Sequence, residues 1–342
     1  MSLPHYQFRN VLVTGGAGFI GSNFIRYLLA TDPAVIIYNL DVLTYAGSPK
    51  NIENLSDPER HTFIQGDICD KQLVTDILQR YAIDTIVHFA AESHVDRSIQ
   101  GPAPFIQTNV VGTFTLLEAA RQYWQQQKSW GPAQCRFHHI STDEVYGSLT
   151  AADAPFTEQT PYAPNSPYSA SKAGSDHLVR AYFHTYQLPV TLSHCSNNYG
   201  PYQHAEKLIP TIIRACQNSQ PIPIYGDGTN VRDWLYVEDH CAGIIKILQE
   251  GKIGEAYNLG GNNQMSNLDV AKHVCDSMDR LYPQSQPYSK LIQFVADRPG
   301  HDWRYAIDTH KIKLNLNWQP RELFFQGLEK TIEFYCIYAH CI

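Results

Sequence analysis

The sequence contains no long uninterrupted run of apolar residues and no excess of basic residues. Its hydrophobic fraction is 43%, yet no stretch approaches the roughly 20 apolar residues that a membrane-spanning helix needs. The amino terminus, MSLPHYQFRN, lacks the basic, apolar and small-residue order of a signal peptide. The formal net charge is -7, whereas a general nucleic-acid binder needs a basic surface. We therefore predict a cytoplasmic protein with neither membrane nor nucleic-acid partners.

Patterns typical of metal sites and disulfide frameworks are also missing. The eight cysteines are scattered and form no CxxC pair, so neither a zinc site nor a disulfide framework is predicted. Histidine is frequent, but no HExxH motif occurs. The adjacent His138 and His139 lie in a strand candidate and would point to opposite faces. We expect reduced thiols and no metal.

Apolar, β-branched segments alternate with helical patterns through the first half of the chain. The strand candidates are NVLVT, VIIYNLD, HTFIQGD, DTIVHFAA, RFHHIS and PVTLSHC. Between the first two, Ile20, Phe24 and Leu28 recur at the four-residue spacing of a helix face. Nearly continuous apolar strands that alternate with helices predict an α/β fold of the Rossmann type, a doubly wound parallel sheet with helices on both faces.

The amino-acid composition changes near residue 196, where proline, glycine and asparagine become more frequent. The chain has 342 residues, more than one hydrophobic core usually organises. We predict a Rossmann domain of residues 1–195 with a returning segment near 232–262, and a smaller α/β lobe of residues 196–231 and 263–342. Near the end, Phe325, Leu328, Ile332 and Tyr335 predict an amphipathic helix that packs back on the body.

A glycine-rich turn links the first strand candidate to the first helix. In VLVTGGAGFIGSNFIRYLL, Gly15, Gly18 and Gly21 fit GxxGxxG. Such glycines let the backbone approach a pyrophosphate, whose charge is met by the N–H groups at the helix start. Asp41 closes the second strand candidate, where a carboxylate binds both ribose hydroxyls and repels a 2'-phosphate. The pattern predicts NAD rather than NADP; the alternative is a purely structural turn.

Residues after the next two strand candidates extend this cofactor hypothesis, because the carboxyl ends of parallel strands share one edge of the sheet. Asp67 and Ile68 follow the third strand and are assigned to the adenine. Ala90, Ala91 and Glu92 follow the fourth strand and are assigned to the pyrophosphate.

A second group of candidate residues follows the fifth strand candidate. The segment STDEVYG places Thr142, Asp143 and Glu144 side by side, and in the later helix Tyr168 and Lys172 are four residues apart and share a face. Free tyrosine has a pKa of about 10, so a neighbouring ammonium and a cationic nicotinamide would be needed to stabilise its phenolate. Adjacent acids often form only a solvated turn or helix cap. Their position downstream of a dinucleotide pattern favours catalysis.

Several blocks resemble a known family. GGAGFIG, the YxxxK pair and NVVGT around Asn109 are similar to the extended short-chain dehydrogenase/reductases. STDEVYG, AESHVDRSI, SNNYGPYQ, EKLIP, YGDGTNVRDWLYVEDH and DRPGHDWRYAID resemble, within these, the dTDP-glucose 4,6-dehydratases, from about residue 10 to residue 310. The resemblance implies conversion of dTDP-glucose to the 4-keto-6-deoxy sugar and water, an early step toward deoxyhexoses such as rhamnose. It also implies tightly bound NAD and a homodimer joined through helices of the cofactor lobe.

The resemblance implies a role for each candidate residue of the second group. Tyr168, with Thr142, would take the proton of the hydroxyl at carbon 4 while hydride passes to NAD. Glu144 would then remove the proton at carbon 5, and a protonated Asp143 would donate to the hydroxyl that leaves carbon 6. One carboxylate must be charged and the other neutral, a state that two close acids favour.

The resemblance also implies further binding residues. For the cofactor these are Phe19, Ile20, Thr44, Thr108, Ser141 and Asn198, with Tyr168 and Lys172. For the substrate they are Ser93, Thr142, Asn197, Lys207, Leu208, Pro223, Tyr225, Arg232, Asn267, Arg298 and His301. The chain departs from the family at Trp303, Ala205 and Gln187, where arginine, proline and glycine are expected. Trp303 removes a positive charge near the nucleotide, which leaves the base preference open.

Two alternatives stay open. A related epimerase or decarboxylase acting on nucleotide sugars shares the cofactor and the tyrosine but does not need an acid at both 143 and 144. A non-catalytic NAD-binding regulator shares the fold and predicts no turnover.

Overall fold

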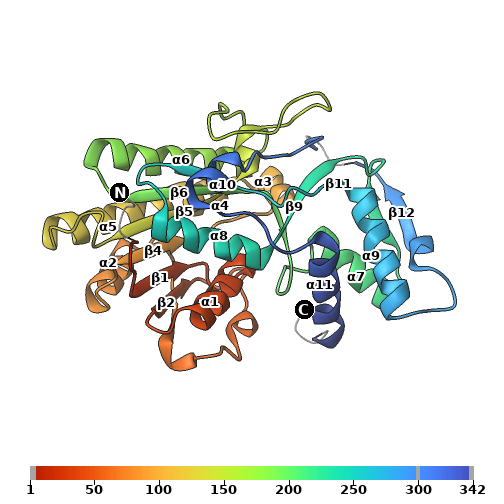
Figure 1. Cartoon of the computed structure of the whole chain (residues 1–342), viewed down its shortest axis with the longest axis horizontal. Coiled ribbons are helices and arrows are strands. Elements are labelled where there is room, and N and C mark those ends of the chain that lie inside the picture. The colour runs from red at the N-terminus through yellow and green to blue at the C-terminus, as the bar shows by residue number, and fades with distance from the viewer. Residues whose placement is uncertain (1–4, 298–300, 339–342) are drawn as a thin grey trace.

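The computed structural model describes residues 5–297 and 301–338, and its centre is a seven-stranded parallel sheet (Figure 1). The strand order is β10-β6-β5-β4-β1-β2-β3. The strands are β1 Asn10–Thr14, β2 Ile36–Asp41, β3 His61–Gln65, β4 Thr85–His88, β5 Arg136–Thr142, β6 Val190–Cys195 and β10 Ala256–Leu259. The order reverses beside β1, which is the mark of a doubly wound sheet. The predicted α/β fold is confirmed, and each of the six strand candidates forms a strand.

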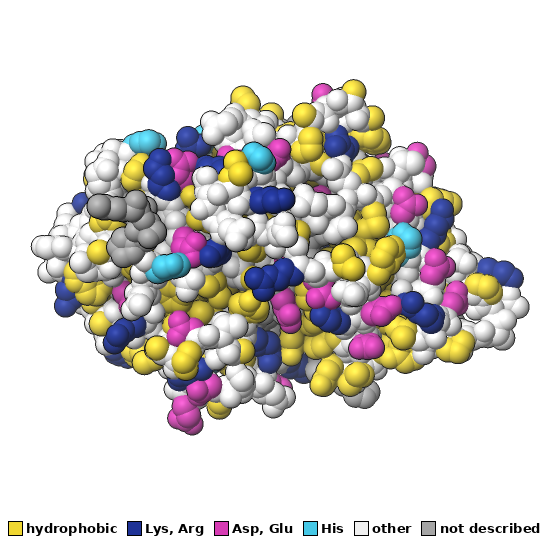
Figure 2. All heavy atoms as spheres, in the orientation of Figure 1, with side chains coloured by type: hydrophobic (Ala, Val, Ile, Leu, Met, Phe, Trp, Pro, Cys, Tyr) yellow, Lys and Arg dark blue, Asp and Glu magenta, His cyan; other side chains and the backbone are white. Residues whose placement is uncertain are grey.

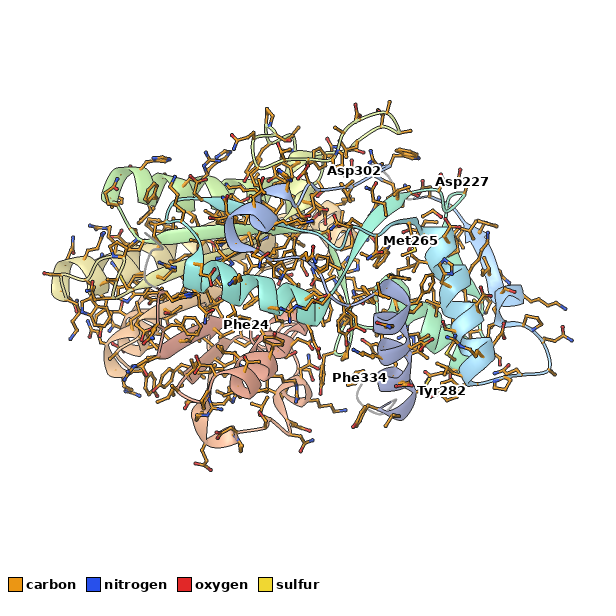
Figure 3. The ribbon with its side chains drawn as sticks, in the orientation of Figure 1. Phe24, Asp227, Met265, Tyr282, Asp302 and Phe334 are labelled. Atoms are coloured by element: carbon orange, nitrogen blue, oxygen red, sulfur yellow. The ribbon has the colours of Figure 1, made fainter. Side chains whose placement is uncertain are left out.

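Helices cover both faces of this sheet, and the alternation of side chains along β1 shows why. Val11 and Val13 pack in the core shared with α1 (Phe19–Thr31) and α8 (Val237–Glu250), whereas Leu12 packs in the core shared with α2 (Lys71–Arg80), α5 (Thr113–Ala120) and α6 (Pro167–Tyr186). Because successive side chains of a strand point to opposite faces, an apolar run such as NVLVT needs a cover on each side. Phe24 of α1 lies in the first of these cores (Figure 3).

Shorter elements connect these layers. Two π-helical segments, Ile106–Gly112 and Arg121–Gln127, flank α5, and α3 (Val95–Gln100), α4 (Ala103–Phe105) and α10 (His310–Leu316) are short helices. The remaining 3-10 turns are Pro49–Ile52, Pro58–Arg60, Asp143–Tyr146 and Tyr288–Leu291. Acidic and basic side chains are mixed on the face of the molecule shown in Figure 2. Within the described ranges no helix is long and apolar enough to cross a membrane.

Among the described residues, the second lobe contains longer helices and small sheets. The helices are α7 Leu208–Gln217, α9 Asn267–Leu281 and α11 Phe324–Ile337. The sheets have the orders β11-β9-β7 and β12-β8, formed by Gln264–Ser266, Val231–Tyr236 and Asn197–Tyr199, and by Ile292–Val295 and Ile222–Tyr225. The division of the chain into a Rossmann domain and a smaller lobe, with boundaries near residues 196, 232 and 263, stays a prediction. In the structure β10 pairs with β6 of the large sheet and α8 packs against that sheet, whereas β9 pairs with β7 and β11.

Two local details differ from simple pattern expectations. In α11, Leu328, Ile332 and Tyr335 are buried as predicted, but Phe325 is 54% exposed and Phe324 takes the buried position instead. Helix α6 is followed by Gln187 in a left-handed conformation, with φ 56°. That conformation favours glycine, which explains the glycine expected there by resemblance; glutamine adopts it at a cost of order 1–2 kcal/mol.

Candidate active site

A cavity of about 380 Å³ follows the carboxyl edge of the large sheet, where the ends of β1 to β6 meet. Ligands of open α/β sheets bind at this edge, near the point where the strand order reverses. Every predicted cofactor residue lines the cavity: Gly15, Gly18, Phe19, Ile20, Gly21, Asp41, Thr44, Asp67, Ile68, Ala90, Ala91, Glu92, Thr108, Ser141, Tyr168, Lys172 and Asn198. Residues from at least six separate segments are thus brought to one place.

The glycine turn is packed too tightly for side chains. Gly15 has φ +72°, and a Cβ atom there would lie 2.6 Å from the backbone nitrogen of Ala90. A Cβ atom at Gly21 would lie 2.3 Å from the Gly15 carbonyl oxygen. The N–H of Gly18 donates to that carbonyl at 3.1 Å, which closes the turn. The loop therefore presents bare backbone at the start of α1, as a pyrophosphate site requires.

Asp41 is held in a fixed orientation at the end of β2. One carboxylate oxygen accepts the N–H of Ala17 at 2.9 Å and the other accepts the N–H of Leu43 at 2.8 Å. Burial raises the pKa of Asp41, and these two N–H groups oppose the shift. Each carboxylate oxygen has a second lone pair, so the group can still accept hydrogen bonds from a diol.

The predicted catalytic residues meet in the same cavity from two elements. Thr142 ends β5, and Asp143 and Glu144 begin the following 3-10 turn, in which the Thr142 hydroxyl accepts the N–H of Glu144 at 3.3 Å. Tyr168 and Lys172 come from α6, whose start is fixed by a capping box between Ser166 and Ser169. All five candidate catalytic residues line the cavity: Thr142, Asp143, Glu144, Tyr168 and Lys172.

The environment of Asp143 favours a neutral carboxylic acid. Asp143 is 2% exposed. Burial raises its pKa well above the usual range, and the negative charges of Glu144 and Asp233 add to the shift, while Arg232 and Thr142 oppose it. The Thr142 hydroxyl lies 3.4 Å from Asp143 Oδ1. Two adjacent acids are therefore electrostatically inequivalent, as a proton donor beside a base would require.

Tyr168 and Lys172 are also both buried. Burial, with Glu144 as the next cause, raises the pKa of Tyr168 well above its usual value, and Thr142 opposes the shift. The pKa of Lys172 is lowered to about 8, chiefly by burial, and the negative charge of Asp176 partly offsets that effect. The ammonium donates to the carbonyl of Ile140 at 2.8 Å. The protein by itself therefore favours a protonated Tyr168, and a cationic ligand is needed to favour its phenolate.

The predicted substrate residues are divided between two places. Ser93, Thr142, Asn197 and Lys207 line the cavity. The others that the structure describes lie in the second lobe or in the segment that follows β12, and do not line it: Leu208, Pro223, Tyr225, Arg232, Asn267 and His301. Arg298 lies outside the described residues.

Two of these outlying residues, Arg232 and His301, contact other side chains or carbonyls of the protein. The Arg232 guanidinium donates to the carbonyl of Asp302 at 2.9 Å and lies 4.4 Å above the ring centroid of Tyr305. His301 Nδ1 lies 2.7 Å from a carboxylate oxygen of Asp297. Arg232 lies close enough to Asp143 to lower its pKa, so the second lobe begins directly beside the catalytic group.

Sequence reasoning missed several residues of the cavity wall, among them Cys195, Ser196, Gln203 and His204. Cys195 ends β6 and Ser196 follows it, so the rule used for the earlier strand ends would have found both. Asn109, quoted only as part of a motif, joins two cavity segments. Its Oδ1 accepts the N–H of Glu92 at 2.8 Å and its Nδ2 donates to Ser171 Oγ at 2.8 Å.

The glycine turn, the strand-end cavity and the tyrosine–lysine pair of α6 define the class of this chain, an extended short-chain dehydrogenase/reductase. The model of a family described as GDP-mannose 4,6 dehydratase matches residues 12–331. The dTDP-glucose 4,6-dehydratase of Neisseria gonorrhoeae is 52% identical over 331 residues, which cover 96% of this chain and 95% of that protein. The chain belongs to the dTDP-glucose 4,6-dehydratase family, and the resemblance predicted from its motifs is confirmed.

Solved structures agree with this assignment. The dTDP-glucose 4,6-dehydratase of Streptomyces venezuelae, solved with NAD and a second ligand, superposes with a TM-score of 0.88 at 45% identity, over 97% of this chain and 98% of that one. The enzyme of the same name from Bacillus anthracis, in complex with NAD, gives a TM-score of 0.86 at 44% identity over 97% and 98% of the two chains.

Proposed function

We propose that this protein is an NAD-dependent dTDP-glucose 4,6-dehydratase, a hydro-lyase that forms dTDP-4-keto-6-deoxyglucose and water. The observation that carries the proposal is the meeting of Asp143, Glu144, Tyr168 and Lys172 in one cavity at the sheet edge. An epimerase or decarboxylase needs the tyrosine and lysine, but only an elimination of water needs an acid and a base side by side. The names of relatives at about half identity support the same activity.

The cavity fits NAD. The bare backbone at Gly15 and Gly18 suits the pyrophosphate, and the fixed carboxylate of Asp41 suits an unphosphorylated ribose. When bound, NAD takes a hydride from carbon 4 of the sugar and later returns it to carbon 6. Since the cofactor is regenerated in each turnover, the protein should hold it tightly.

In the oxidation, Tyr168 takes the proton of the hydroxyl at carbon 4. The hydroxyl of Thr142 favours the phenolate against the burial that opposes it. The Lys172 ammonium, which shares the helix face of Tyr168, is proposed to add to this effect. A carbonyl at carbon 4 then acidifies the proton at carbon 5, because the carbanion is delocalised as an enolate.

In the elimination, Glu144 removes the proton at carbon 5 and Asp143 donates a proton to the hydroxyl that leaves carbon 6 as water. The raised pKa of Asp143 favours the protonated form that this donor needs. After hydride has reached carbon 6, Glu144 returns its proton to carbon 5.

The proton balance shows one further requirement. In each turnover Tyr168 gains a proton and Asp143 loses one, whereas Glu144 ends as it began. A proton must therefore return from Tyr168 to Asp143 before the next cycle. The Thr142 hydroxyl lies 3.4 Å from Asp143 Oδ1 and also interacts with Tyr168, so it offers a direct path.

Substrate recognition is assigned to the second lobe and to its border with the cavity. Ser93 and Asn197 line the cavity and are proposed to contact the hexose, and Lys207 is proposed to contact the diphosphate. The outlying residues Leu208, Pro223, Tyr225, Arg232, Asn267 and His301, with Arg298, are proposed for the nucleotide. Arginine suits phosphate because its planar fork donates two hydrogen bonds at once.

The activity is tested by incubating the purified protein with dTDP-glucose and recording the ultraviolet absorbance that a 4-keto sugar develops in alkali. We expect that signal together with the release of water. Formation of the 4-epimer, or no reaction at all, would reject the proposal. The same assay with UDP-, CDP- and GDP-glucose determines the base preference, which Trp303 leaves open.

We further propose a cytoplasmic homodimer. Ile106, Val111 and Phe114 are 49%, 38% and 46% exposed along one helical stretch of the cofactor lobe, and apolar exposure of this kind favours a partner surface. The cysteines within the described ranges are free thiols, which supports a reducing compartment. Sedimentation should give the mass of a dimer, and Phe114→Glu should give that of a monomer.

A further inference from the structure

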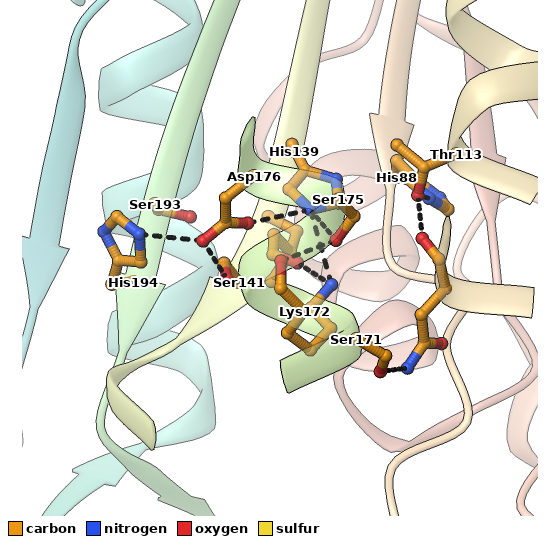
Figure 4. Close-up of polar contacts among 12 residues, drawn as sticks. His88, Thr113, His139, Ser141, Ser171, Lys172, Ser175, Asp176, Ser193 and His194 are labelled. Atoms are coloured by element: carbon orange, nitrogen blue, oxygen red, sulfur yellow. Dashed lines mark hydrogen bonds and ion pairs between the residues drawn. The ribbon is translucent and has the colours of Figure 1, made fainter. Parts of the chain in front are cut away.

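A buried polar cluster lies directly behind Lys172, between α6 and the ends of β5 and β6 (Figure 4). At its centre is Asp176, which follows Lys172 by four residues and therefore shares its helix face. Asp176 is fully buried and does not line the cavity, whereas Lys172 does. None of the proposed catalytic steps uses Asp176.

Four side chains surround the Asp176 carboxylate. The Ser141 hydroxyl and the Tyr162 hydroxyl donate to Oδ2 at 2.8 and 3.1 Å. His194 Nε2 lies 3.2 Å from Oδ2, and His139 Nε2 lies 3.2 Å from Oδ1. Burial raises the pKa of Asp176, but His139 and His194 outweigh it and hold the pKa well below its usual range. Asp176 is therefore a buried anion at neutral pH, and buried charges require charged or strongly polar partners.

His139 connects this anion to Lys172. Its Nε2 atom, 3.2 Å from Asp176 Oδ1, is also 3.4 Å from Lys172 Nζ. Burial, with Lys172 as the next cause, lowers the pKa of His139 to about 4, so the imidazole is neutral at neutral pH. A neutral ring carries either a proton or a lone pair at Nε2, so His139 can donate to the Asp176 carboxylate or accept from the Lys172 ammonium, but not both at once. In either state the ring lies between one full positive charge and one full negative charge.

We propose that Asp176 is the counter-ion of Lys172 and positions its ammonium beside Tyr168, with His139 between the two charges. The proposal rests on the proposed function, because that function gives Lys172 its role. Asp176 acts through Lys172 and is a positioning residue, since it touches neither the cavity nor the groups that react.

Other titratable groups also face Lys172 and Asp176. They are His139 of β5, His194 and Cys195 of β6, Tyr162 of the loop before α6 and, behind His139, His88 of β4. Burial raises the pKa of Cys195 to about 12, and burial lowers that of His88 well below its usual value, so both are neutral near pH 7. The carboxylate that raises the pKa of Lys172 is that of Asp176.

The direction of the expected pH effect follows from these charges. Burial lowers the pKa of Lys172 to about 8, and Asp176 opposes that shift. Without the carboxylate the pKa of Lys172 falls further, so the ammonium is lost at a lower pH as the pH rises. An opposite charge within about 4–6 Å shifts a pKa by roughly 1–3 units.

The test compares wild type, D176N and D176E as holoproteins. Formation of the 4-keto sugar is measured across pH, and the charge of Lys172 is followed by NMR of ¹³Cε-labelled lysine, with K172M to assign the signal. In D176N the alkaline limb of activity and the Lys172 titration should both move down by about one to three pH units, while D176E keeps them near wild type. If D176N fails to fold, D176S serves in its place.

The matched control is D239N. Asp239 is a buried carboxylate on α8 that accepts the N–H groups of Arg321 and Glu322 at 3.0 and 2.8 Å, so its loss should lower stability and leave the alkaline limb in place. The proposal would be overturned if D176N lowered the rate of 4-keto sugar formation by the same factor at every pH and left the Lys172 titration unchanged. The titration needs no turnover; a protein that forms no 4-keto sugar would reject the proposed function, while the NMR result would still decide the role of Asp176.

Discussion

The carboxyl edge of the large sheet and the second lobe differ in how completely they gather their predicted residues. All residues assigned to the cofactor or to catalysis line one cavity at the sheet edge. Of the substrate residues, Ser93, Thr142, Asn197 and Lys207 also line it, whereas the others that the structure describes lie on α7, β8, β9, α9 and the segment after β12. The fold therefore brings the residues of the first region together, whereas those of the second region lie on separate elements.

Strand pairing explains this difference. Thr14 pairs with Leu40 and His88, and Thr142 pairs with Cys195, so the register of the sheet brings the strand ends level. Within the part of the chain that the structure describes, the two small sheets of the second lobe pair neither with the large sheet nor with each other. Its cations also engage local partners, as Arg232 does with the Asp302 carbonyl. The comparison predicts that changes at the sheet edge reduce kcat, whereas changes in the second lobe raise KM.

The largest effect is expected for Tyr168→Phe. Removing the hydroxyl removes the group that takes the proton at carbon 4, and a positioned acid or base contributes about 10²–10⁴ in rate. We expect kcat for 4-keto sugar formation to fall by about 10³ or more, with KM nearly unchanged. Tyr186→Phe, at an exposed position of the same helix, is the control and should keep the wild-type rate. A Tyr168→Phe enzyme that keeps more than about a tenth of kcat would remove the tyrosine from the mechanism.

A somewhat smaller effect, with a distinct signature, is expected for Glu144→Gln. The amide cannot remove the proton at carbon 5, so elimination should slow by about 10²–10³. Oxidation at carbon 4 should persist, and reduced cofactor should therefore accumulate on the protein, which its ultraviolet absorbance reports. Glu158→Gln is the control, because that carboxylate accepts the N–H of Asn258 and does not line the cavity. Water loss at the wild-type rate in Glu144→Gln would assign the base to another residue.

Much of the first region could be predicted because its signals are local in the sequence. The glycine turn, the apolar strands and the spacing of Tyr168 and Lys172 each depend on fewer than about twenty consecutive residues. The Asp176 cluster was not predicted. It depends on the register that sets Ser141 of β5 beside His194 of β6, and pairing between distant segments is not encoded in either one alone.

The same reasoning explains smaller errors. In α11 the spacing assigned Phe325 to the core, but Phe325 is exposed and Phe324 packs with residues of α7 and α9 instead. In the second lobe, the residues proposed for the nucleotide were assigned by resemblance alone, because hydrophobic periodicity does not identify a ligand site. Spacing predicts which residues share a face of a helix or strand, but not which faces of separate elements surround a ligand.

The smallest effect is expected for Tyr225→Ala, which tests the other side of the comparison. Tyr225 ends β8 and is 46% exposed, as suits a ring that stacks on a nucleotide base. Such stacking contributes roughly 1 kcal/mol or more, so KM for dTDP-glucose should rise by about fivefold. The value of kcat should stay within about twofold, because Tyr225 does not line the cavity that contains the candidate catalytic residues. Tyr282→Ala, on an exposed tyrosine that follows α9, should change neither constant. Steady-state kinetics on the three proteins decide the matter: a fall in kcat at constant KM would place Tyr225 within the chemistry, and the two regions would then no longer divide catalysis from binding.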